Sequence, residues 1–312
     1  MTNPAIDQSR IEKYGSLEFL ARQVVEGFIT GLHKSPLHGF SVEFAEHRLY
    51  NAGESTKHID WKLYGKTDKL FVKKFEEETN LRCQIIIDNS SSMYFPFKKN
   101  IDSNNLNKIT FSIYSAAAIM YLLRKQRDAT GLSVYSDKLE EHTQCKSTYS
   151  HHKYLYTILE KMLVPISADV RKQTSTASIL HLIAESIHKR SLIVIFSDMF
   201  ENVQGNDEVF KALQHLRHNK NEVVLFHVVD KSKEIDFDYN DRPYKFIDVE
   251  TNKEVKINPS EIKEYYNKKI KEFEKSLKMK CNQYHIDFIE ADINRGFDAV
   301  LDAFFIKRMR ML

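Results

Sequence analysis

Residues 83–93 read CQIIIDNSSSM, so an apolar run ends at Asp88 and three serines follow at positions 90 to 92. A short, continuous apolar run is typical of a strand that is buried on both faces of a parallel sheet. An aspartate and serines directly after such a strand have two interpretations. They are common in turns, because their side chains bond to their own backbone. Their oxygen atoms are also suitable ligands for a hard cation. The choice between a turn and a cation site depends on which other residues the chain places beside this loop.

From Leu81 to the C-terminus, apolar runs alternate with segments of helical periodicity. Strands are predicted at residues 83–88, 129–137, 191–198, 222–230 and 285–292. Helices are predicted at residues 107–128, 151–163, 175–190, 207–219 and 259–282, and from about Phe297 onward. A hairpin is predicted at residues 244–257, with its turn near Thr251 and Asn252. This alternation predicts an α/β fold with a largely parallel, doubly wound sheet.

The first 80 residues have a different pattern. Residues 16–33 place Leu, Phe, Val and Ile at helical spacing, and residues 35–79 are rich in turn and strand formers. Short alternating runs such as Phe71, Lys73 and Phe75 indicate antiparallel strands. We therefore predict two domains, a small helix-plus-strand module at residues 1–80 and the α/β domain at residues 81–312.

The composition is that of a globular protein with a buried core. Of the 312 residues, 42% are hydrophobic and 12% are aromatic. The 46 Lys and Arg residues nearly balance the 43 Asp and Glu residues, so the concentrated basic face that binds nucleic acid is not indicated. Cys83, Cys145 and Cys281 are far apart and form no C-x-x-C pair, which argues against a disulfide framework and a zinc site.

Neither a signal peptide nor a membrane span is expected. The N-terminal stretch MTNPAIDQSRIEKYG lacks the apolar centre of a signal peptide. The longest apolar stretch is about AAAIMYLL, far below the roughly 18 to 20 residues that cross a bilayer. We therefore expect a cytoplasmic protein.

Acidic residues close five of the predicted strands. They are Asp88, Asp137, Asp198, Asp230 and Asp292. Ligands of open α/β sheets bind outside the carboxyl ends of the strands, so these positions are candidates for a site. Most of them fit turn chemistry, but two strand ends carry additional oxygen atoms.

The strand end at Asp88 forms the pattern D-x-S-x-S, with Ser90 and Ser92 as the two serines. A hard divalent cation such as Mg²⁺ takes about six oxygen ligands and usually keeps several waters. Asp198, which follows the apolar run LIVIFS, is the best second carboxylate, and the stretch KQTST supplies a threonine hydroxyl from Thr174 or Thr176. The sequence thus predicts a site for Mg²⁺, with Mn²⁺ or Ca²⁺ as other possible cations.

This set of residues resembles the metal-ion-dependent adhesion site of von Willebrand factor A domains. The resemblance implies that Asp88, Ser90 and Ser92 form the first loop, Thr174 the second and Asp198 the third. The resemblance favours Thr174, because it lies six residues before Leu180, the spacing at which the threonine of that family precedes a helix leucine, and Thr176 is the alternative. Asp137 and Asp230 match no motif and are interpreted as turn or cap residues.

The N-terminal block resembles the signature of a bacterial family called domain of unknown function 58. The matching residues are Arg48, Tyr50, Gly53, Glu54, Ile59, Asp60, Trp61 and Lys66. Glu54 stands where Asp is commoner, and Gly65-Lys66 stands where Ala-Arg is commoner. Recognisable motifs cover residues 35–200, and the remainder is similar in element order. The resemblance implies a von Willebrand factor A-like domain of Rossmann type and a partner among the AAA+ ATPases of the MoxR type.

The ligand set suggests partner binding rather than catalysis. Three hydroxyls and at most two carboxylates leave a divalent cation poorly neutralised, which favours an acidic ligand from another protein. A hydrolase would need a nearby general base, and the three loops contain none. We expect no catalytic residues. The alternatives are a Mg²⁺-dependent phosphohydrolase or nuclease at the same strand ends, and a scaffold whose site holds no metal.

Two other motifs do not indicate a binding site. Residues 65–67, GKT, match the end of a phosphate-binding loop, but neither its first glycine nor a buried strand precedes them. His151 and His152 lie near Cys145, but adjacent residues diverge on a helix, so both histidines are predicted at a solvated helix start.

Overall fold

The computed structural model describes residues 17–32, 47–49, 61–73, 81–97, 106–163, 176–199, 206–247 and 254–311. The chain divides into two compact units. One unit comprises Leu81–Leu312 together with the residues up to Gly31, and the other comprises Leu32–Asn80.

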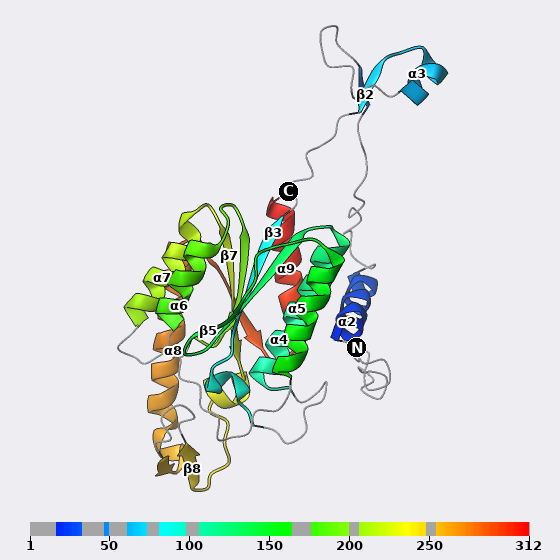
Figure 1. The fold of residues 1–312 in the computed structure, drawn as a ribbon. Coiled ribbons are helices and arrows are strands. Elements are labelled where there is room, and N and C mark those ends of the chain that lie inside the picture. The colour runs from blue at the N-terminus through cyan, green and yellow to red at the C-terminus, as the bar shows by residue number, and fades with distance from the viewer. Residues whose placement is uncertain are drawn as a thin grey trace. The chain divides into compact units, whose positions relative to one another are not determined.

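A six-stranded sheet forms the centre of the larger unit (Figure 1). Its strands are β3 (Arg82–Asp88), β4 (Ala129–Tyr135), β5 (Leu139–His142), β6 (Leu192–Ser197), β7 (Glu222–Val229) and β10 (Asp287–Asp292). They lie in the order β10-β7-β6-β3-β4-β5. All neighbours are parallel except β5, which is antiparallel to β4. The predicted α/β fold with a largely parallel, doubly wound sheet is confirmed.

The strand β3 shows why this sheet forms. Ile85, Ile86 and Ile87 are all fully buried, and they alternate between the two faces of the sheet. β-branched side chains fit a pleated sheet, and burying each one contributes roughly 1.5–3 kcal/mol. A polar residue at Ile86 would therefore be expected to disrupt the central strand.

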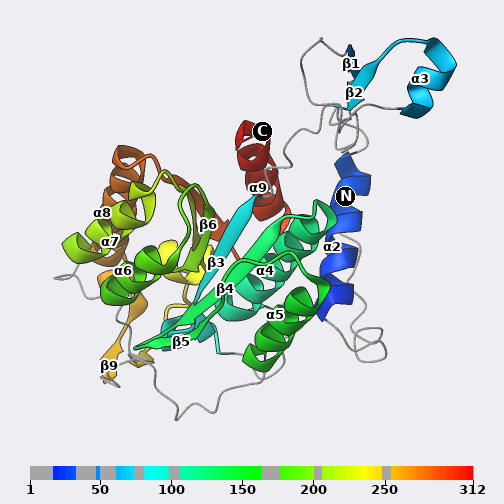
Figure 2. The ribbon, with the colours of Figure 1, turned by 45° about the horizontal axis from the view of Figure 1, so that its top comes forward.

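Helices cover both faces of the sheet, as Figures 1 and 2 show. One face is covered by α4 (Lys108–Lys125), α5 (Tyr149–Met162) and α9 (Asp298–Met311), with α2 (Leu17–Leu32) packed against them. The other face is covered by α6 (Thr176–Ser186), α7 (Asn206–His218) and α8 (Pro259–Gln283). The sheet is thus buried on both sides, as its continuous apolar strands require.

The helix α4 begins at the carboxyl edge of the sheet and is buried along most of its length. Asn107 caps it, because its side-chain oxygen accepts a hydrogen bond from the Thr110 N–H at 2.9 Å. The Lys108 N–H donates to the Phe95 carbonyl at 3.0 Å. These contacts fix the first turn of α4 directly above the loop that follows β3.

The helix α2 packs on the α/β domain, although the sequence pattern groups it with residues 35–80. Leu17, Ala21 and Val25 belong to the same apolar cluster as α4 and α5. The Leu17 N–H donates to Glu160 Oε1 at 2.9 Å, and the Phe28 ring stacks on Phe305 at 5.4 Å. Nearly all of α2 thus belongs to the same compact unit as Leu81–Leu312, whereas the sequence pattern groups it with residues 35–80. Its apolar stripe is the reason, since it needs a core to cover it.

In the smaller unit, β1 (His47–Leu49) pairs with β2 (Phe71–Lys73) in antiparallel register. The predicted strand at Phe71 and Lys73 is therefore confirmed. The helix α3 (Trp61–Thr67) was not predicted, because its aromatic residues and Gly65 have low helix propensity. The Trp61 and Tyr64 rings meet edge to face at 6.2 Å, a contact that the helical i,i+3 spacing permits.

The structure corrects the interpretation of His152. The helix α5 begins at Tyr149, two residues before the predicted start, and this places His152 on the same face as Leu155, Tyr156 and Leu159. His152 is fully buried, so the prediction of a solvated helix start is wrong for this residue.

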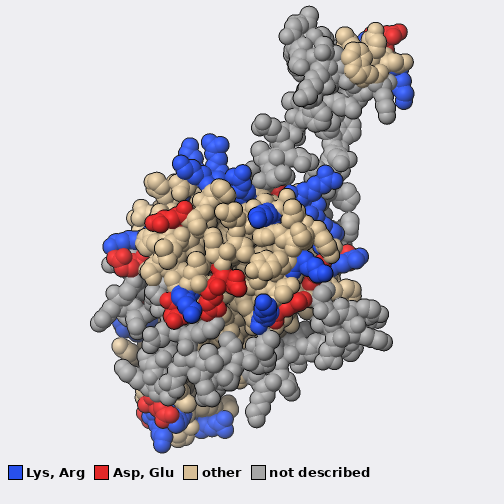
Figure 3. Space-filling model, in the orientation of Figure 1, with Lys and Arg blue, Asp and Glu red and all other residues tan. Residues whose placement is uncertain are grey.

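The last third of the larger unit adds two small elements at the carboxyl edge of the sheet. A π-helical turn, η3 (Lys231–Ile235), follows β7. The predicted hairpin is present as β8 (Tyr244–Ile247) and β9 (Glu254–Ile257), which pair antiparallel. Within the described ranges, no helix combines the length and the apolar character needed to cross a bilayer. On the face drawn in Figure 3, basic and acidic side chains of the described residues are interspersed, in line with the balanced composition.

Candidate metal centre

The candidate site lies where the order of strands reverses. From β3 the chain builds outward through β4 to β5, and then returns to place β6 on the other side of β3. Such a switch point leaves an opening beyond the carboxyl ends of the two diverging strands, where ligands bind in doubly wound folds. The register pairs Ile87 with Phe196, so Asp88 at the end of β3 lies next to Ser197 and Asp198 at the end of β6.

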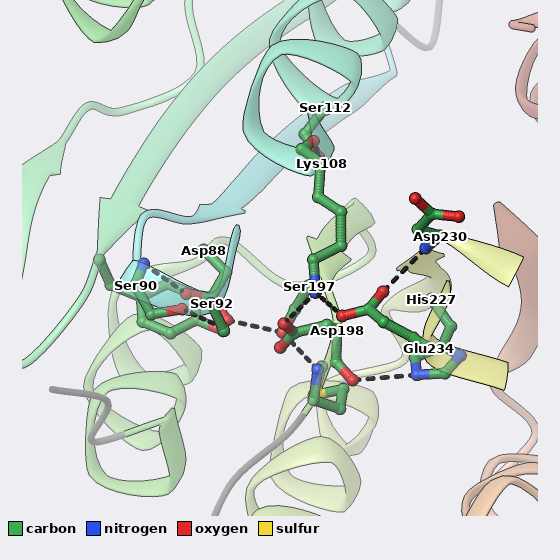
Figure 4. Close-up of polar contacts among 12 residues, drawn as sticks. Asp88, Ser90, Ser92, Lys108, Ser112, Ser197, Asp198, His227, Asp230 and Glu234 are labelled. Carbon is green, nitrogen blue, oxygen red and sulfur yellow. Dashed lines mark hydrogen bonds and ion pairs between the residues drawn. The ribbon is translucent and has the colours of Figure 1, made fainter. Parts of the chain in front are cut away.

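The first loop folds around the Asp88 carboxylate (Figure 4). Asp88 Oδ1 accepts a hydrogen bond from the Ser90 N–H at 2.9 Å, the turn contact expected of an aspartate in this position. The turn brings Ser90 Oγ within 3.0 Å of Ser92 Oγ, and a 3₁₀ turn, η2 (Ser91–Tyr94), follows. The two hydroxyls of the D-x-S-x-S pattern therefore lie side by side next to the carboxylate.

The second oxygen of Asp88 is held by two hydroxyl groups from neighbouring strands. Ser197 Oγ donates to Asp88 Oδ2 at 2.7 Å, and the Tyr135 hydroxyl donates to the same oxygen at 3.3 Å. Asp88 is 1% exposed. Burial, and then the charge of Asp198, raise the pKa of Asp88 to about 6, against the lowering effect of the Ser197 hydrogen bond. Asp88 is thus a buried carboxylate surrounded by hydroxyl groups.

Asp198 in the third loop is also buried, but it is paired with a lysine. Lys108 Nζ lies 2.8 Å from Asp198 Oδ2 and 2.6 Å from Glu234 Oε1. Figure 4 shows the Lys108 side chain reaching from the start of α4 to a point between the two carboxylates. Burial lowers the pKa of Lys108, but the two carboxylates raise it by more, and the resulting pKa is above the ordinary lysine value. The ammonium group is therefore charged.

His227 on β7 fixes the backbone of the same loop. Its Nε2–H donates to the Asp198 carbonyl oxygen at 2.9 Å. Burial lowers the pKa of His227 to about 4, so the ring is neutral at pH 7. His227 therefore acts as a neutral donor that orients the Asp198 loop.

The second loop is described in part. Thr174, the preferred ligand from this loop, lies outside the described residues. Thr176, the alternative, is buried at the start of α6, and its side chain bonds to the Tyr135 hydroxyl that contacts Asp88. One threonine of the predicted pair thus lies in the hydroxyl network around the first carboxylate.

Other strand-end aspartates do not join the site. Asp137 is exposed and accepts a hydrogen bond from Ser136 Oγ at 2.9 Å. Asp230 caps η3, because its side chain accepts from the Lys233 N–H. Asp292 Oδ1 accepts from the Asn294 N–H at 3.1 Å. The interpretation of Asp137 and Asp230 as turn and cap residues agrees with these contacts.

Sequence reasoning missed four residues of this cluster, Tyr135, Ser197, Lys108 and Glu234. Ser197 directly precedes Asp198, so a search for hydroxyls at strand ends could have found it. Lys108 carried a weaker signal, since it is a charged residue that opens an otherwise largely apolar helix. Glu234 carried none, because it reaches the site through η3 and its contact with Lys108.

The donor set fits a hard divalent cation. The described groups at the switch point are carboxylate and hydroxyl oxygens, which suit Mg²⁺, Mn²⁺ or Ca²⁺ rather than Zn²⁺. In the described part of the chain, no three His, Cys, Asp and Glu side chains gather closely enough to hold a metal by themselves. A cation here would therefore depend on Ser90 and Ser92 as well as on Asp88 and Asp198.

Comparisons with solved structures give only distant likenesses. The conserved hypothetical protein BatB from Bacteroides thetaiotaomicron aligns with a TM-score of 0.46 at 11% identity, covering 74% of this chain and 98% of that one. The VWA domain of SpRpn10 aligns with a TM-score of 0.35 at 14% identity, covering 47% of this chain and 75% of that one.

Comparisons of sequence identify the family. Uncharacterized proteins of Mycobacterium bovis and Mycobacterium tuberculosis are 24% identical over 184 residues, which are 59% of this chain and 55% of each relative. The chain thus spans about half the length of the curated relatives it matches. The family model described as "Protein of unknown function DUF58" matches residues 46–276, well over half of the chain. The protein therefore belongs to the DUF58 family, as the resemblance in its N-terminal signature and strand-end motif predicts.

Proposed function

We propose that this protein is a non-enzymatic interaction protein that binds its partner through a divalent cation. Asp88, Ser90, Ser92 and Asp198 hold the cation, together with a threonine hydroxyl from Thr174 or Thr176. The observation that carries the proposal is the pair of Ser90 and Ser92 hydroxyls, 3.0 Å apart beside the buried Asp88 at the switch point of the sheet. This is the place where doubly wound folds bind ligands.

The charge of the cluster suggests what the partner contributes. The proposed ligands include only two carboxylates, and Asp198 already shares its charge with Lys108 at 2.8 Å. A bound Mg²⁺ would accept an acidic oxygen from outside, because hard cations prefer charged oxygen ligands and keep exchangeable waters. The partner is therefore proposed to present an Asp or Glu side chain.

Two contacts weigh against a hydrolase at the same place. A water-activating base must lie within hydrogen-bond reach of the attacking water and be able to accept its proton. The His227 Nε2–H is engaged with the Asp198 carbonyl, and Glu234 is engaged with Lys108 at 2.6 Å. One cavity of about 230 Å³ is lined by Phe111, Lys231, Asp292 and neighbouring residues, and none of the proposed ligands lines it.

The partner itself is proposed from family membership. Proteins of this family commonly accompany MoxR-type AAA+ ATPases, which supports a cytoplasmic role in ATPase-driven maturation or assembly of other proteins. The acidic ligand would belong to the ATPase or to its client.

The test is an affinity capture from cells that produce this protein, with Mg²⁺ or with chelator. The bait is the wild-type chain, Asp88→Ala or the control Asp292→Ala, which removes an aspartate from another strand end. We expect a MoxR-type ATPase, identified by mass spectrometry, with wild type and Asp292→Ala in Mg²⁺ only. Equal recovery with Asp88→Ala or with chelator would refute the metal-bridged interaction. Mg²⁺-dependent release of phosphate from model esters, lost in Asp88→Ala, would favour the hydrolase instead.

A further inference from the structure

A protein side chain already supplies a positive charge at the candidate metal centre. The Lys108 ammonium lies between Asp198 and Glu234, and the Lys108 side chain is fully buried. Figure 4 shows its side chain reaching from α4 toward Asp198 and Glu234. The ammonium contacts Oδ2 of Asp198, a residue that is also proposed as a ligand of the cation.

The position of Lys108 is unfavourable for the helix that carries it. It is the first residue of α4, where the helix dipole favours negative rather than positive charge. Burying a charged side chain also has a large desolvation cost unless partners compensate for it. Helix formation therefore does not explain a buried lysine here, whereas the two carboxylates do.

The two partners of Lys108 differ in their relation to the proposed site. Asp198 directly follows β6 beside Asp88, while Glu234 lies on η3 beyond β7. Glu234 is itself held in place, since its Oε2 accepts from the Asp230 N–H at 2.8 Å and its carbonyl accepts from the Tyr266 hydroxyl at 2.8 Å. Glu234 can thus keep the ammonium in place when Asp198 is drawn toward another cation.

We propose that Lys108 is an internal competitor of the divalent cation for Asp198, and that Glu234 retains the ammonium when the metal binds. This inference rests on the proposed metal-dependent function and concerns its regulation. Two cations that share one carboxylate weaken each other's binding, so Lys108 sets the affinity of the site for metal. Removing the lysine should strengthen metal binding, because the metal then no longer competes with it for Asp198. Removing Glu234 should weaken metal binding, because Asp198 is then the only one of these two carboxylates left to pair with the lysine.

The chain offers a matched control pair. Lys231 and Glu290 form a salt bridge of 3.0 Å between η3 and β10, also at the carboxyl side of the sheet, and their side chains are 35% and 38% exposed. Substituting them changes the net charge by the same amount as substituting Lys108 and Glu234. The exposed pair is screened by solvent and salt, so it should affect metal binding little.

The experiment is a calorimetric titration of the full chain with Mg²⁺ and with Mn²⁺. The variants are Lys108→Met, Glu234→Gln, Lys231→Met and Glu290→Gln, each checked for folding by circular dichroism. We expect Lys108→Met to bind at least about tenfold more tightly than wild type, Glu234→Gln several-fold more weakly, and both controls within about threefold of wild type. Mg²⁺ should also raise the Tm of Lys108→Met more than that of wild type, because tighter binding stabilises the folded state more.

The outcomes separate this inference from the proposed function. Metal binding by Lys108→Met but not by wild type would support the competition and refute the metal-bridged function. Binding by wild type that Lys108→Met does not improve would overturn the competition and leave the metal site intact. No binding by any variant would overturn both. Should Lys108→Met fail to fold, Glu234→Gln is informative alone, since an affinity equal to that of Glu290→Gln would overturn the inference.

Discussion

Two pairs of aspartates lie at the carboxyl edge of the same sheet, and their partners differ in kind. Asp230 and Asp292 follow or end β7 and β10, and both accept hydrogen bonds from the Asn294 side-chain amide, at 3.0 and 3.1 Å. Asp88 and Asp198 end or follow β3 and β6. Hydroxyl groups surround Asp88, and Asp198 pairs with the Lys108 ammonium.

The difference shows how the same residue type at equivalent strand ends can serve structure or binding. Backbone N–H and side-chain amide donors, with the Ser232 hydroxyl at Asp230, hold Asp230 and Asp292 as cap and turn residues. Asp88 also accepts from a backbone N–H, but its other oxygen accepts from two hydroxyls of neighbouring strands. A hydroxyl can turn its lone pairs toward a cation, and an ammonium can be replaced by one. The partners of an aspartate, rather than its place at a strand end, therefore indicate a ligand site.

The largest effect is expected from breaking the ion pairs of Lys108. Lys108→Met leaves Asp198 and Glu234 buried without their shared counter-ion, which should lower the free energy of unfolding by about 3–5 kcal/mol in chelator. The matched Lys231→Met removes an exposed pair and should cost less than about 1 kcal/mol. Urea unfolding of both variants measures the difference. Equal losses of stability in the two variants would show that the buried Lys108 ion pairs contribute no more than the exposed Lys231–Glu290 pair.

His152 is a buried titratable residue with no carboxylate within bonding distance among the described residues. Its burial should make the stability of the protein depend on pH. Burial, and then the positive charges of His151 and Arg124, lower the pKa of His152 to about 4, while an unfolded histidine titrates near 6.5. As the pH falls, His152 therefore binds a proton in the unfolded chain at a higher pH than in the folded chain. Stability from this group is present above about pH 6.5 and is lost as the pH falls toward 4, by up to about 3 kcal/mol.

The measurement for His152 compares urea unfolding at pH 7.5 and pH 5 for wild type and His152→Gln. Wild type should lose more stability between the two pH values than the variant does, and the excess reports His152. An identical loss of stability in the two proteins would mean that His152 is already protonated in the folded state at pH 5.

Metal affinity should distinguish the two pairs of aspartates directly. Asp88→Asn removes the carboxylate of the first loop, so we expect Mn²⁺ affinity to fall by at least about a hundredfold, or about 2.8 kcal/mol. Asp292→Asn should leave it within about threefold, because Asp292 accepts from Asn294 rather than from the hydroxyl network. Electron paramagnetic resonance of free Mn²⁺ gives both affinities. A similar loss of Mn²⁺ affinity in the two variants would show that the metal does not bind specifically at the switch point.

The sequence predicts most of the fold because buried parallel strands are continuous apolar runs. β3 and β6 were found in this way, whereas β5 was missed, since its sequence LEEH is short and polar as befits an edge strand. The helix α3 was missed because local propensity opposed it. The packing of α2 on the α/β domain was also beyond a local pattern, because a stripe of apolar residues does not say which core it covers.

The site was predictable where its residues are neighbours in sequence. Asp88, Ser90 and Ser92 form one turn, and Asp198 ends an obvious strand. Lys108 contacts Asp198 across 90 positions and Glu234 across 126, so no spacing rule brings them together. Those contacts follow from the start of α4 and the course of η3, which tertiary packing determines. Thr174 lies outside the described residues, and its role as a ligand stays a prediction.

The smallest effect is expected at the structural pair, where Asp230 caps η3. Asp230→Ala removes the acceptor for the Ser232 hydroxyl at 2.8 Å, for the Lys233 N–H at 3.3 Å and for the Asn294 amide at 3.0 Å. Loss of a cap costs about 1 kcal/mol, so the urea midpoint should shift modestly, and Mn²⁺ affinity should stay within about threefold of wild type. Asp230→Asn keeps an acceptor oxygen and should recover most of the stability. A loss of metal binding in Asp230→Ala would show that Asp230 is more than a cap, because η3 and its Glu234 would then be needed to position the metal centre. The Asp230–Asp292 pair and the Asp88–Asp198 pair would then belong to one site.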